Sequence, residues 1–227
     1  MFVIALIASL AGCTPTVHAL TTHVPPLHAS RRSASKVRPA DSTLVTLFEK
    51  GVPFARFVEA ATARRDGWLR LQRDAVIAPA TLARARAVGG MWRLLVIARD
   101  ACGDSMNSVP YAAVLADSVA GVSLRVVSPD DADVVSRAHR TMDGRTATPT
   151  FIMLDASGVE AGCLVELPSP LRQWTDSART TASNDALHAY RSAFYARDRG
   201  ASVSLELVEL LEAARAGSPR CDRQTPY

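Results

Sequence analysis

Short apolar runs bounded by turn residues alternate with longer amphipathic stretches through the centre of the chain. The apolar runs predict four strands, at 92–98, 123–128, 150–155 and 161–167. Apolar residues at spacings of three and four predict two helices between them, at about 104–118 and 130–139. This alternation, closed by a hairpin, predicts an α/β fold with a four-stranded mixed central sheet flanked by helices.

Helical periodicity continues on both sides of this segment. The stretch 42–75, with Ser42 as its N-cap, predicts two helices separated near Gly51-Val52-Pro53. A short helix follows at 79–88 and ends at a glycine pair, and two more are predicted within 185–216. We therefore expect a domain over 41–175 with an N-terminal helical extension, and C-terminal helices that either pack on the core or extend it.

The N-terminal residues are apolar up to Leu10-Ala11-Gly12-Cys13. This run is too short to span a bilayer, which needs about 20 residues, but it has the length of the apolar part of a secretion signal. The four residues resemble a bacterial lipobox, which implies that 1–12 is a signal peptide and that Cys13 becomes the lipidated N-terminus. No Lys or Arg follows Met1, and cleavage after Ala19 is the alternative, giving a secreted soluble protein.

Residues 13–40 combine Pro, Ser, Thr and Ala without an apolar period, which predicts a tether. His18, His23 and His28 recur in it, but no framework fixes them, so no metal site is predicted. Both interpretations of the N-terminus place the rest of the chain outside the cytoplasm. We expect a cell-envelope protein, facing the periplasm or on the cell surface, that meets the membrane only through its lipid.

Composition narrows the classes of partner. The chain has 227 residues, of which 48% are hydrophobic and 21% charged, as in ordinary globular proteins. Lys and Arg number 26 against 22 Asp and Glu, but the arginines are spread along the chain and do not cluster with aromatic residues. We interpret them as solvated surface and predict no nucleic-acid partner.

Cys102 carries the candidate chemistry, in the stretch "RDACGDSMNSVP". It follows an expected strand and precedes an expected helix, whose free N–H groups and partial positive charge stabilise a thiolate and lower the pKa of the thiol. A thiolate is the nucleophile of thiol–disulfide exchange. The alternative is that Cys102 is a small buried hydrophobe, as free cysteines commonly are.

A second motif, Thr148-Pro149, opens the strand at 150–155. Proline there can hold a cis peptide bond, whose exposed backbone pairs with an extended substrate. The order of elements, together with "ACGDSMNSVPYAAVLA" and "DGRTATPTFIMLDASG", resembles the thioredoxin-like superfamily, and within it a bacterial family with a Trp-Cys-Gly-Asp-Ser/Cys motif, over about 43–174. The resemblance implies a thioredoxin-like fold, substrate binding by Thr148 and Pro149, and protein or small-molecule thiols and disulfides as partners. No cofactor is expected.

The sequence departs from that family at three positions. Ala101 replaces a tryptophan, Val96 stands where thioredoxins keep a buried carboxylate, and Ser105 stands where a second cysteine would be. Ser105 can donate a hydrogen bond to a thiolate, but it cannot attack a mixed disulfide. A dithiol cycle within the motif is therefore excluded, and the motif indicates a monothiol reductase or isomerase with Cys102 and Ser105 as catalytic residues.

The remaining cysteines, Cys163 and Cys221, leave several roles open. Either could resolve a mixed disulfide on Cys102, but structural pairing of the two, or burial of Cys163, is favoured. Small thiols or a partner protein are the simpler resolving agents.

For the polar residues near the motif, structural roles are the favoured interpretation. Asp104 is interpreted as a helix-capping residue. His139, Arg140 and Arg145 flank the loop that faces the motif in a thioredoxin fold. Arg145 could stabilise the thiolate, but the favoured interpretation is that it is a solvated surface residue.

Two other functions compete with the redox interpretation. In the first, the groove beside Pro149 binds extended peptides and Cys102 is incidental, so the protein is a non-catalytic binding module. In the second, Cys-Gly-Asp-Ser is similar to the Cys-Gly-Phe-Ser motif of monothiol glutaredoxins, which bind an iron–sulfur cluster with glutathione. An exported location holds little glutathione, which makes the cluster the least favoured of the three.

Overall fold

A five-stranded mixed sheet forms the centre of the protein in the computed structural model, which describes residues 41–222. The strand order is β2-β1-β3-β4-β5. The strands are β1 (Trp92–Ile97), β2 (Val122–Val127), β3 (Thr150–Leu154), β4 (Glu160–Val165) and β5 (Arg220–Asp222). β1 is parallel to β2 and antiparallel to β3, β3 is antiparallel to β4, and β5 is parallel to β4. The predicted mixed sheet flanked by helices is confirmed, with one strand more than expected.

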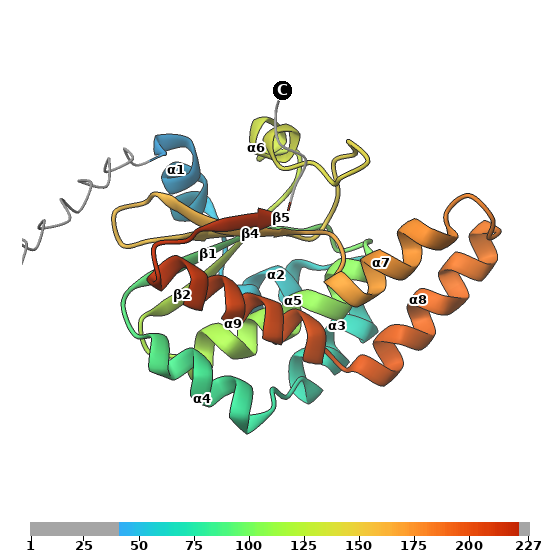
Figure 1. The fold of residues 1–227 in the computed structure, drawn as a ribbon, viewed down its shortest axis with the longest axis horizontal. Coiled ribbons are helices and arrows are strands. Elements are labelled where there is room, and N and C mark those ends of the chain that lie inside the picture. The colour runs from blue at the N-terminus through green and yellow to red at the C-terminus, as the bar shows by residue number, and fades with distance from the viewer. Residues whose placement is uncertain (1–40, 223–227) are drawn as a thin grey trace, which may run out of the picture. The chain divides into compact units, whose positions relative to one another are not determined.

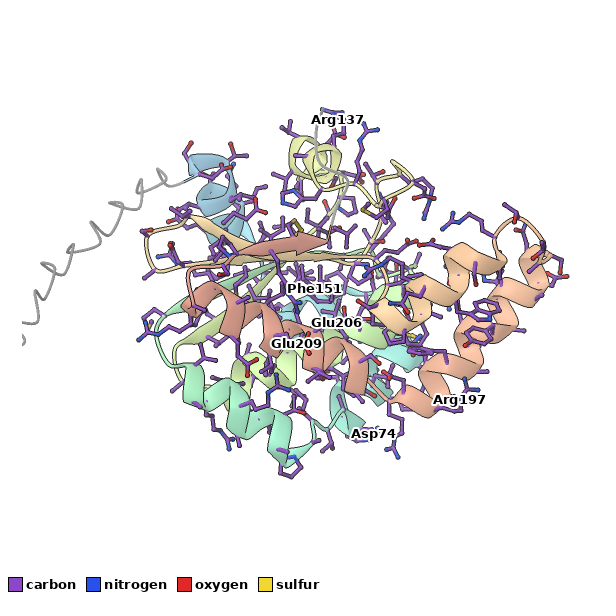
Figure 2. The ribbon with its side chains drawn as sticks, viewed as in Figure 1. Asp74, Arg137, Phe151, Arg197, Glu206 and Glu209 are labelled. Atoms are coloured by element: carbon purple, nitrogen blue, oxygen red, sulfur yellow. A yellow bond between two sulfur atoms is a disulfide. The ribbon has the colours of Figure 1, made fainter. Side chains whose placement is uncertain are left out.

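Helices cover both faces of the sheet (Figure 1). One face carries α1 (Ser42–Lys50) and α6 (Asp133–Ala138). The other carries α2 (Phe54–Ala60), α3 (Arg65–Asp74), α4 (Pro79–Val88), α5 (Gly103–Ser118) and α9 (Ala201–Arg215). Because side chains alternate along a strand, Leu95 and Ile97 pack toward α1 and α6, whereas Leu94 and Val96 pack toward α5 and α9. Phe151, labelled in Figure 2, belongs to the second core.

The N-terminal helical region differs from the prediction in two respects. The N-cap of α1 is Asp41 and not Ser42, because the Asp41 carboxylate accepts the N–H groups of Thr43 and Leu44. Three helices, and not two, precede α4. The additional break lies at Arg64, which has a φ of 53° in the left-handed region.

The C-terminal region packs on the core, which was one of the two alternatives left open. Val203, Leu207 and Leu211 of α9 are buried in the same core as β1 and α5. Two elements were not predicted, α7 (Ser169–Ala178) and β5. α7 packs beside α8 (Asn184–Asp198), where Trp174 stacks on Tyr190 with ring centroids 3.4 Å apart. Among residues 41–222, no helix combines the length and apolar character needed to cross a membrane.

The predicted signal peptide at 1–12, the lipidation site Cys13 and the tether at 13–40 lie outside the described residues. They stay predictions.

Candidate functional site

Cys102 is the N-cap residue of α5, with φ and ψ of −80° and 122°, and its side chain is half-buried. Its Sγ accepts the backbone N–H of Ser105 at 3.4 Å and donates to the carbonyl oxygen of Thr148 at 3.1 Å. The Thr148–Pro149 peptide bond is cis. The fold thus brings the end of β1, the first turn of α5 and the start of β3 together around one sulfur atom.

The two hydrogen bonds act on the sulfur in opposite directions. The N–H group at the helix N-terminus carries a partial positive charge that is directed at the sulfur. It therefore stabilises the negatively charged thiolate. The Thr148 carbonyl can only accept, so its contact requires the protonated thiol. The sulfur is therefore held between a group that favours the nucleophilic form and a group that favours the resting thiol.

Ser105 contributes through its backbone. The sequence suggested that its hydroxyl can donate to the thiolate, but this hydroxyl is fully buried and makes no hydrogen bond. The N–H makes the contact instead, because the third residue of a helix directs its N–H at the side chain of the N-cap residue.

Arg64, which the sequence did not single out, lies beside the motif. Its Nε donates to the carbonyl oxygen of Ala101 at 2.7 Å. A Cβ placed on Gly103 would lie 3.7 Å from the Cζ of Arg64, so the guanidinium packs over the start of α5. No local pattern marks this arginine, because the chain between α2 and α3 brings it to the motif from far upstream.

Asp100 holds that connecting segment in place. Its carboxylate accepts the N–H groups of Thr62 and Ala63, both at 2.9 Å, and the hydrogen bond from Ala63 is the main reason why the pKa of Asp100 is lowered. The carbonyl oxygen of Asp100 accepts the indole N–H of the fully buried Trp68 at 2.9 Å. Together these bonds fix Arg64 relative to the end of β1.

Asp104 links the motif to the C-terminal helices. Its carboxylate accepts the hydroxyl of Tyr195 at 2.9 Å and faces Nη1 of Arg191 at 3.3 Å, both from α8. Burial raises the pKa of Asp104, and Arg191 and the Tyr195 hydroxyl oppose this shift. Asp104 lies in the first turn of α5, but Cys102 holds the N-cap position. The favoured capping role of Asp104 is therefore corrected to a tie between α5 and α8.

A pocket of about 590 Å³ opens beside Gly103 and Asp104. Its lining includes four arginines, Arg64, Arg70, Arg191 and Arg199, together with the carboxylates of Asp74 and Asp104. In the sequence these arginines are dispersed, which indicates solvated surface. They come from separate elements that only the fold brings together.

The loop between α6 and β3 is held by ion pairs. Arg145 lies 2.8 Å from Asp143 and 3.1 Å from Glu166, and Arg140 donates to backbone carbonyl groups. Arg145 is thus engaged with Asp143 of its own loop and with Glu166 after β4, and not with Cys102. His139, which flanks the same loop, is buried.

The pKa of Asp143 predicts that the loop between α6 and β3 is sensitive to acid. Burial raises its pKa, but hydrogen bonds from Arg145 and Thr141 outweigh burial and lower the pKa to about 2. Its folded pKa lies below the unfolded value of about 3.9. The stability that Asp143 contributes is therefore complete above about pH 4 and lost as the pH falls through about 2.

We expect Asp143→Asn to lower the free energy of unfolding at pH 7, and the difference from the unmutated protein to shrink between pH 4 and pH 2. Urea unfolding at several pH values measures it. Asp176→Asn is the control, since Asp176 meets Arg179 only at 3.6 Å. A difference that stays constant down to pH 2 would contradict the assignment.

Comparison with known proteins agrees with this architecture. The family model described as thioredoxin matches residues 51–179, which is more than half of the chain. A crystal structure of a protein of unknown function from Pseudomonas aeruginosa is similar, with a TM-score of 0.61 and 20% identity over 75% of this chain and 97% of that one. An HIV epitope-scaffold has a TM-score of 0.58 and 19% identity, over 74% and 97% of the two chains. These two likenesses show the fold alone.

No match was found among curated proteins. The family match, the mixed sheet and the position of Cys102 before α5 agree with one another, and the chain belongs to the thioredoxin family.

Proposed function

We propose that this protein is an exported thiol–disulfide exchange protein that works through the single thiol of Cys102. The observation that carries the proposal is the placement of Cys102: its half-exposed Sγ accepts a helix N-terminal N–H and lies beside the cis-proline loop. Protein or small-molecule disulfides are the substrates, and no cofactor takes part.

The reaction balances with two thiols and one disulfide. The Cys102 thiolate attacks one sulfur of the substrate disulfide, a Cys102–substrate S–S bond forms, and the substrate S–S bond breaks. The leaving thiolate takes a proton from solvent. An external thiolate then attacks the substrate sulfur of the mixed disulfide and releases Cys102, so the external thiol ends as a disulfide with that part of the substrate.

Residues 41–222 hold no further thiol for the second step, so it falls to a thiol from outside that part of the chain. Ser105 has no sulfur, and Cys163 and Cys221 are joined to each other by a disulfide. The structural pairing of these two cysteines, which the sequence favoured over a resolving role, is therefore present. In this state neither of them has a free thiolate with which to attack a mixed disulfide on Cys102.

Trapping tests the proposal directly. The full chain, incubated with a small aromatic disulfide and no reductant, should gain one adduct within 41–222, which peptide mapping locates at Cys102, with one thiol released for that adduct. Cys102→Ser should give no adduct within 41–222. If Cys102 stays unmodified while a solvent-exposed model thiol reacts, the exchange function is wrong.

The peptide-binding alternative is favoured by one feature of the same region. A pocket of about 290 Å³ beside Thr148 is lined by Arg99, Asp130, Asp133 and neighbouring residues, and no charged group occupies position 96. In that case, an unfolded peptide should bind equally well to the unmutated protein and to Cys102→Ser, and no adduct should form.

Lipidation at Cys13 is a separate proposal, which rests on Leu10-Ala11-Gly12-Cys13 and on the tether composition of 13–40. Labelling cells with a fatty-acid analogue should mark the protein, and Cys13→Ala should abolish the label, because the thiol carries the diacylglycerol. Cys102→Ala is the control and should keep the label. An unlabelled, secreted protein would support cleavage after Ala19 instead.

A further inference from the structure

Four residues with metal-binding side chains meet at the β4–β5 edge of the sheet. His139 follows α6, Glu160 and Cys163 belong to β4, and Cys221 belongs to β5. One donor atom from each lies within 4.8 Å of the others. Cys163 and Cys221 are register partners on the two parallel strands, with their Cα atoms 4.3 Å apart, and they form the disulfide.

His139 is oriented as a metal-binding histidine would be. Its Nδ1 lies 2.9 Å from the carbonyl oxygen of Val135, which can only accept, so the proton is on Nδ1. Its Nε2 is buried, makes no hydrogen bond and points at the cluster. A backbone carbonyl that fixes the tautomer and frees the second ring nitrogen is the usual support of a metal-bound imidazole.

The burial of this imidazole makes the free nitrogen informative. His139 is only 3% exposed, and buried polar atoms nearly always have a partner. A charged group faces it: Oε1 of Glu160 lies 3.3 Å from Nε2 without the geometry of a hydrogen bond. Two zinc ligands in a tetrahedral site lie about 3.3 to 3.5 Å apart when both are N or O donors. The His139–Glu160 separation agrees with this spacing.

We propose that reduction of the Cys163–Cys221 disulfide creates a Zn²⁺ site formed by these two cysteines, His139 and Glu160. Two thiolates, one imidazole and one carboxylate give four ligands, the number that a structural zinc site takes, and sulfur and nitrogen donors select zinc over calcium and magnesium. The sulfur atoms of two zinc-bound thiolates lie about 3.8 Å apart. The facing register of Cys163 and Cys221 requires only a small separation after the bond is broken.

Each step of this switch balances. A dithiol reductant attacks one sulfur of the disulfide and then closes its own disulfide, so two electrons pass to the protein and two protein thiols form. Zn²⁺ then replaces the two thiol protons, which are released to solvent. Oxidation by a disulfide oxidant reverses both steps and releases the metal. The zinc site thus holds β5 against β4 in the reduced state, as the disulfide does in the oxidised state.

The disulfide can be reached from outside through Cys221. Cys221 is half-exposed, whereas Cys163 is fully buried. A reductant therefore meets Cys221 first.

Zinc binding by the full chain tests the proposal. The chain is reduced with a phosphine, which takes up the oxygen of water as the disulfide is reduced, and the phosphine is then removed without air. Zn²⁺ is titrated against a chromophoric chelator, with the oxidised chain in parallel. The reduced chain should bind one Zn²⁺ more than the oxidised chain, which carries the same N-terminal histidines and the same Cys102. Equal binding by the two forms would overturn the proposal.

Ligand variants separate this site from adventitious binding by two thiols. His139→Gln and Glu160→Gln should each weaken the additional site at least about 10-fold, since even outer-shell changes at metal sites have effects of 10- to 100-fold. His188→Gln, at an exposed histidine of α8, is the matched control and should bind as the unmutated chain does. Unchanged affinity in both ligand variants would show binding by the cysteines alone and would overturn the four-ligand site.

Alkylation of the unmutated chain tests the proposal even if one of the ligand variants fails to fold. In the reduced unmutated chain, Zn²⁺ should protect Cys163 and Cys221 from alkylation, while Cys102 is labelled at the same rate with and without the ion. Cys102→Ser should keep the zinc site, so the result is independent of the exchange function. No protection of Cys163 and Cys221 would refute the proposal.

Discussion

Cys221→Ser, studied with a zinc chelator present, is expected to lower the free energy of unfolding by about 4 kcal/mol. The Cys163–Cys221 disulfide joins residues 58 apart in sequence, and a cross-link over a loop of this length removes about 4 kcal/mol of chain entropy from the unfolded state. For a chain of this size, the loss corresponds to a fall in the unfolding midpoint of roughly 10 °C. Urea and thermal unfolding measure both quantities.

The choice of Cys221 avoids a second effect. Cys163 is fully buried among Leu95, Ile152 and Val165, so a serine there would add the cost of a buried hydroxyl. Reducing the unmutated protein should reproduce the loss seen in Cys221→Ser, and reductant should have no further effect on that variant. Cys102→Ser should remain sensitive to reductant. A loss below about 1 kcal/mol would show that the disulfide does not hold the C-terminal strand to the folded core.

The local signals in the sequence were sufficient for the central elements. Apart from Arg93, the run Trp92–Ile97 is apolar along both faces, because cores lie on both sides of β1. Such a run predicts a buried strand even when its partner strands are unknown. Gly89 and Gly90 mark the end of α4 because both adopt positive φ. The position of Cys102 before α5 could be predicted from the same kind of local signal, the change from an apolar run to a helical pattern.

Elements and contacts that depend on distant partners could not be predicted in this way. β5 has three residues, and its place at the edge of the sheet depends on pairing with β4 and on the disulfide. The break before α3 depends on Asp100, which accepts the N–H groups of Thr62 and Ala63 across the fold.

The surroundings of Cys102 show the same limit. Arg64 reaches the motif from the connection between α2 and α3, and Arg191 reaches it from α8, so neither stands near Cys102 in the sequence. The metal site could not be predicted either, because its residues come from three separate places along the chain: His139 after α6, Glu160 and Cys163 on β4, and Cys221 on β5. Their convergence follows from strand register and not from the spacing of a motif.

Ser105→Cys is expected to turn capture into complete exchange. In the unmutated protein, a captured substrate stays on Cys102 until an outside thiol arrives. Ser105 lies three residues after Cys102 in the first turn of α5, where its N–H contacts the Cys102 sulfur at 3.4 Å and its side chain is buried. Its hydroxyl makes no hydrogen bond, so sulfur can replace oxygen there without breaking one.

The difference is visible in a single turnover without added reductant. With the Cys163–Cys221 disulfide intact, the Cys102 thiol of the unmutated chain should retain half of a small disulfide as an adduct, with one small thiol released. Under the same conditions, Ser105→Cys with both motif thiols free should release two small thiols and retain no adduct on Cys102, because the new thiolate attacks the Cys102 sulfur and closes a disulfide between positions 102 and 105 with the loss of two hydrogens. Intact mass and thiol titration distinguish the two outcomes.

Ser108→Cys is the matched control for this experiment. Ser108 is buried on the same helix, so the substitution makes the same change of oxygen to sulfur in the same core. It lies three residues farther along α5, about 4.5 Å along the helix axis, which takes its sulfur beyond reach of Cys102. Ser108→Cys should therefore keep the adduct. If the adduct on Cys102 persists in Ser105→Cys while the fold is intact, the lack of a thiol at position 105 is not the reason why the mixed disulfide accumulates.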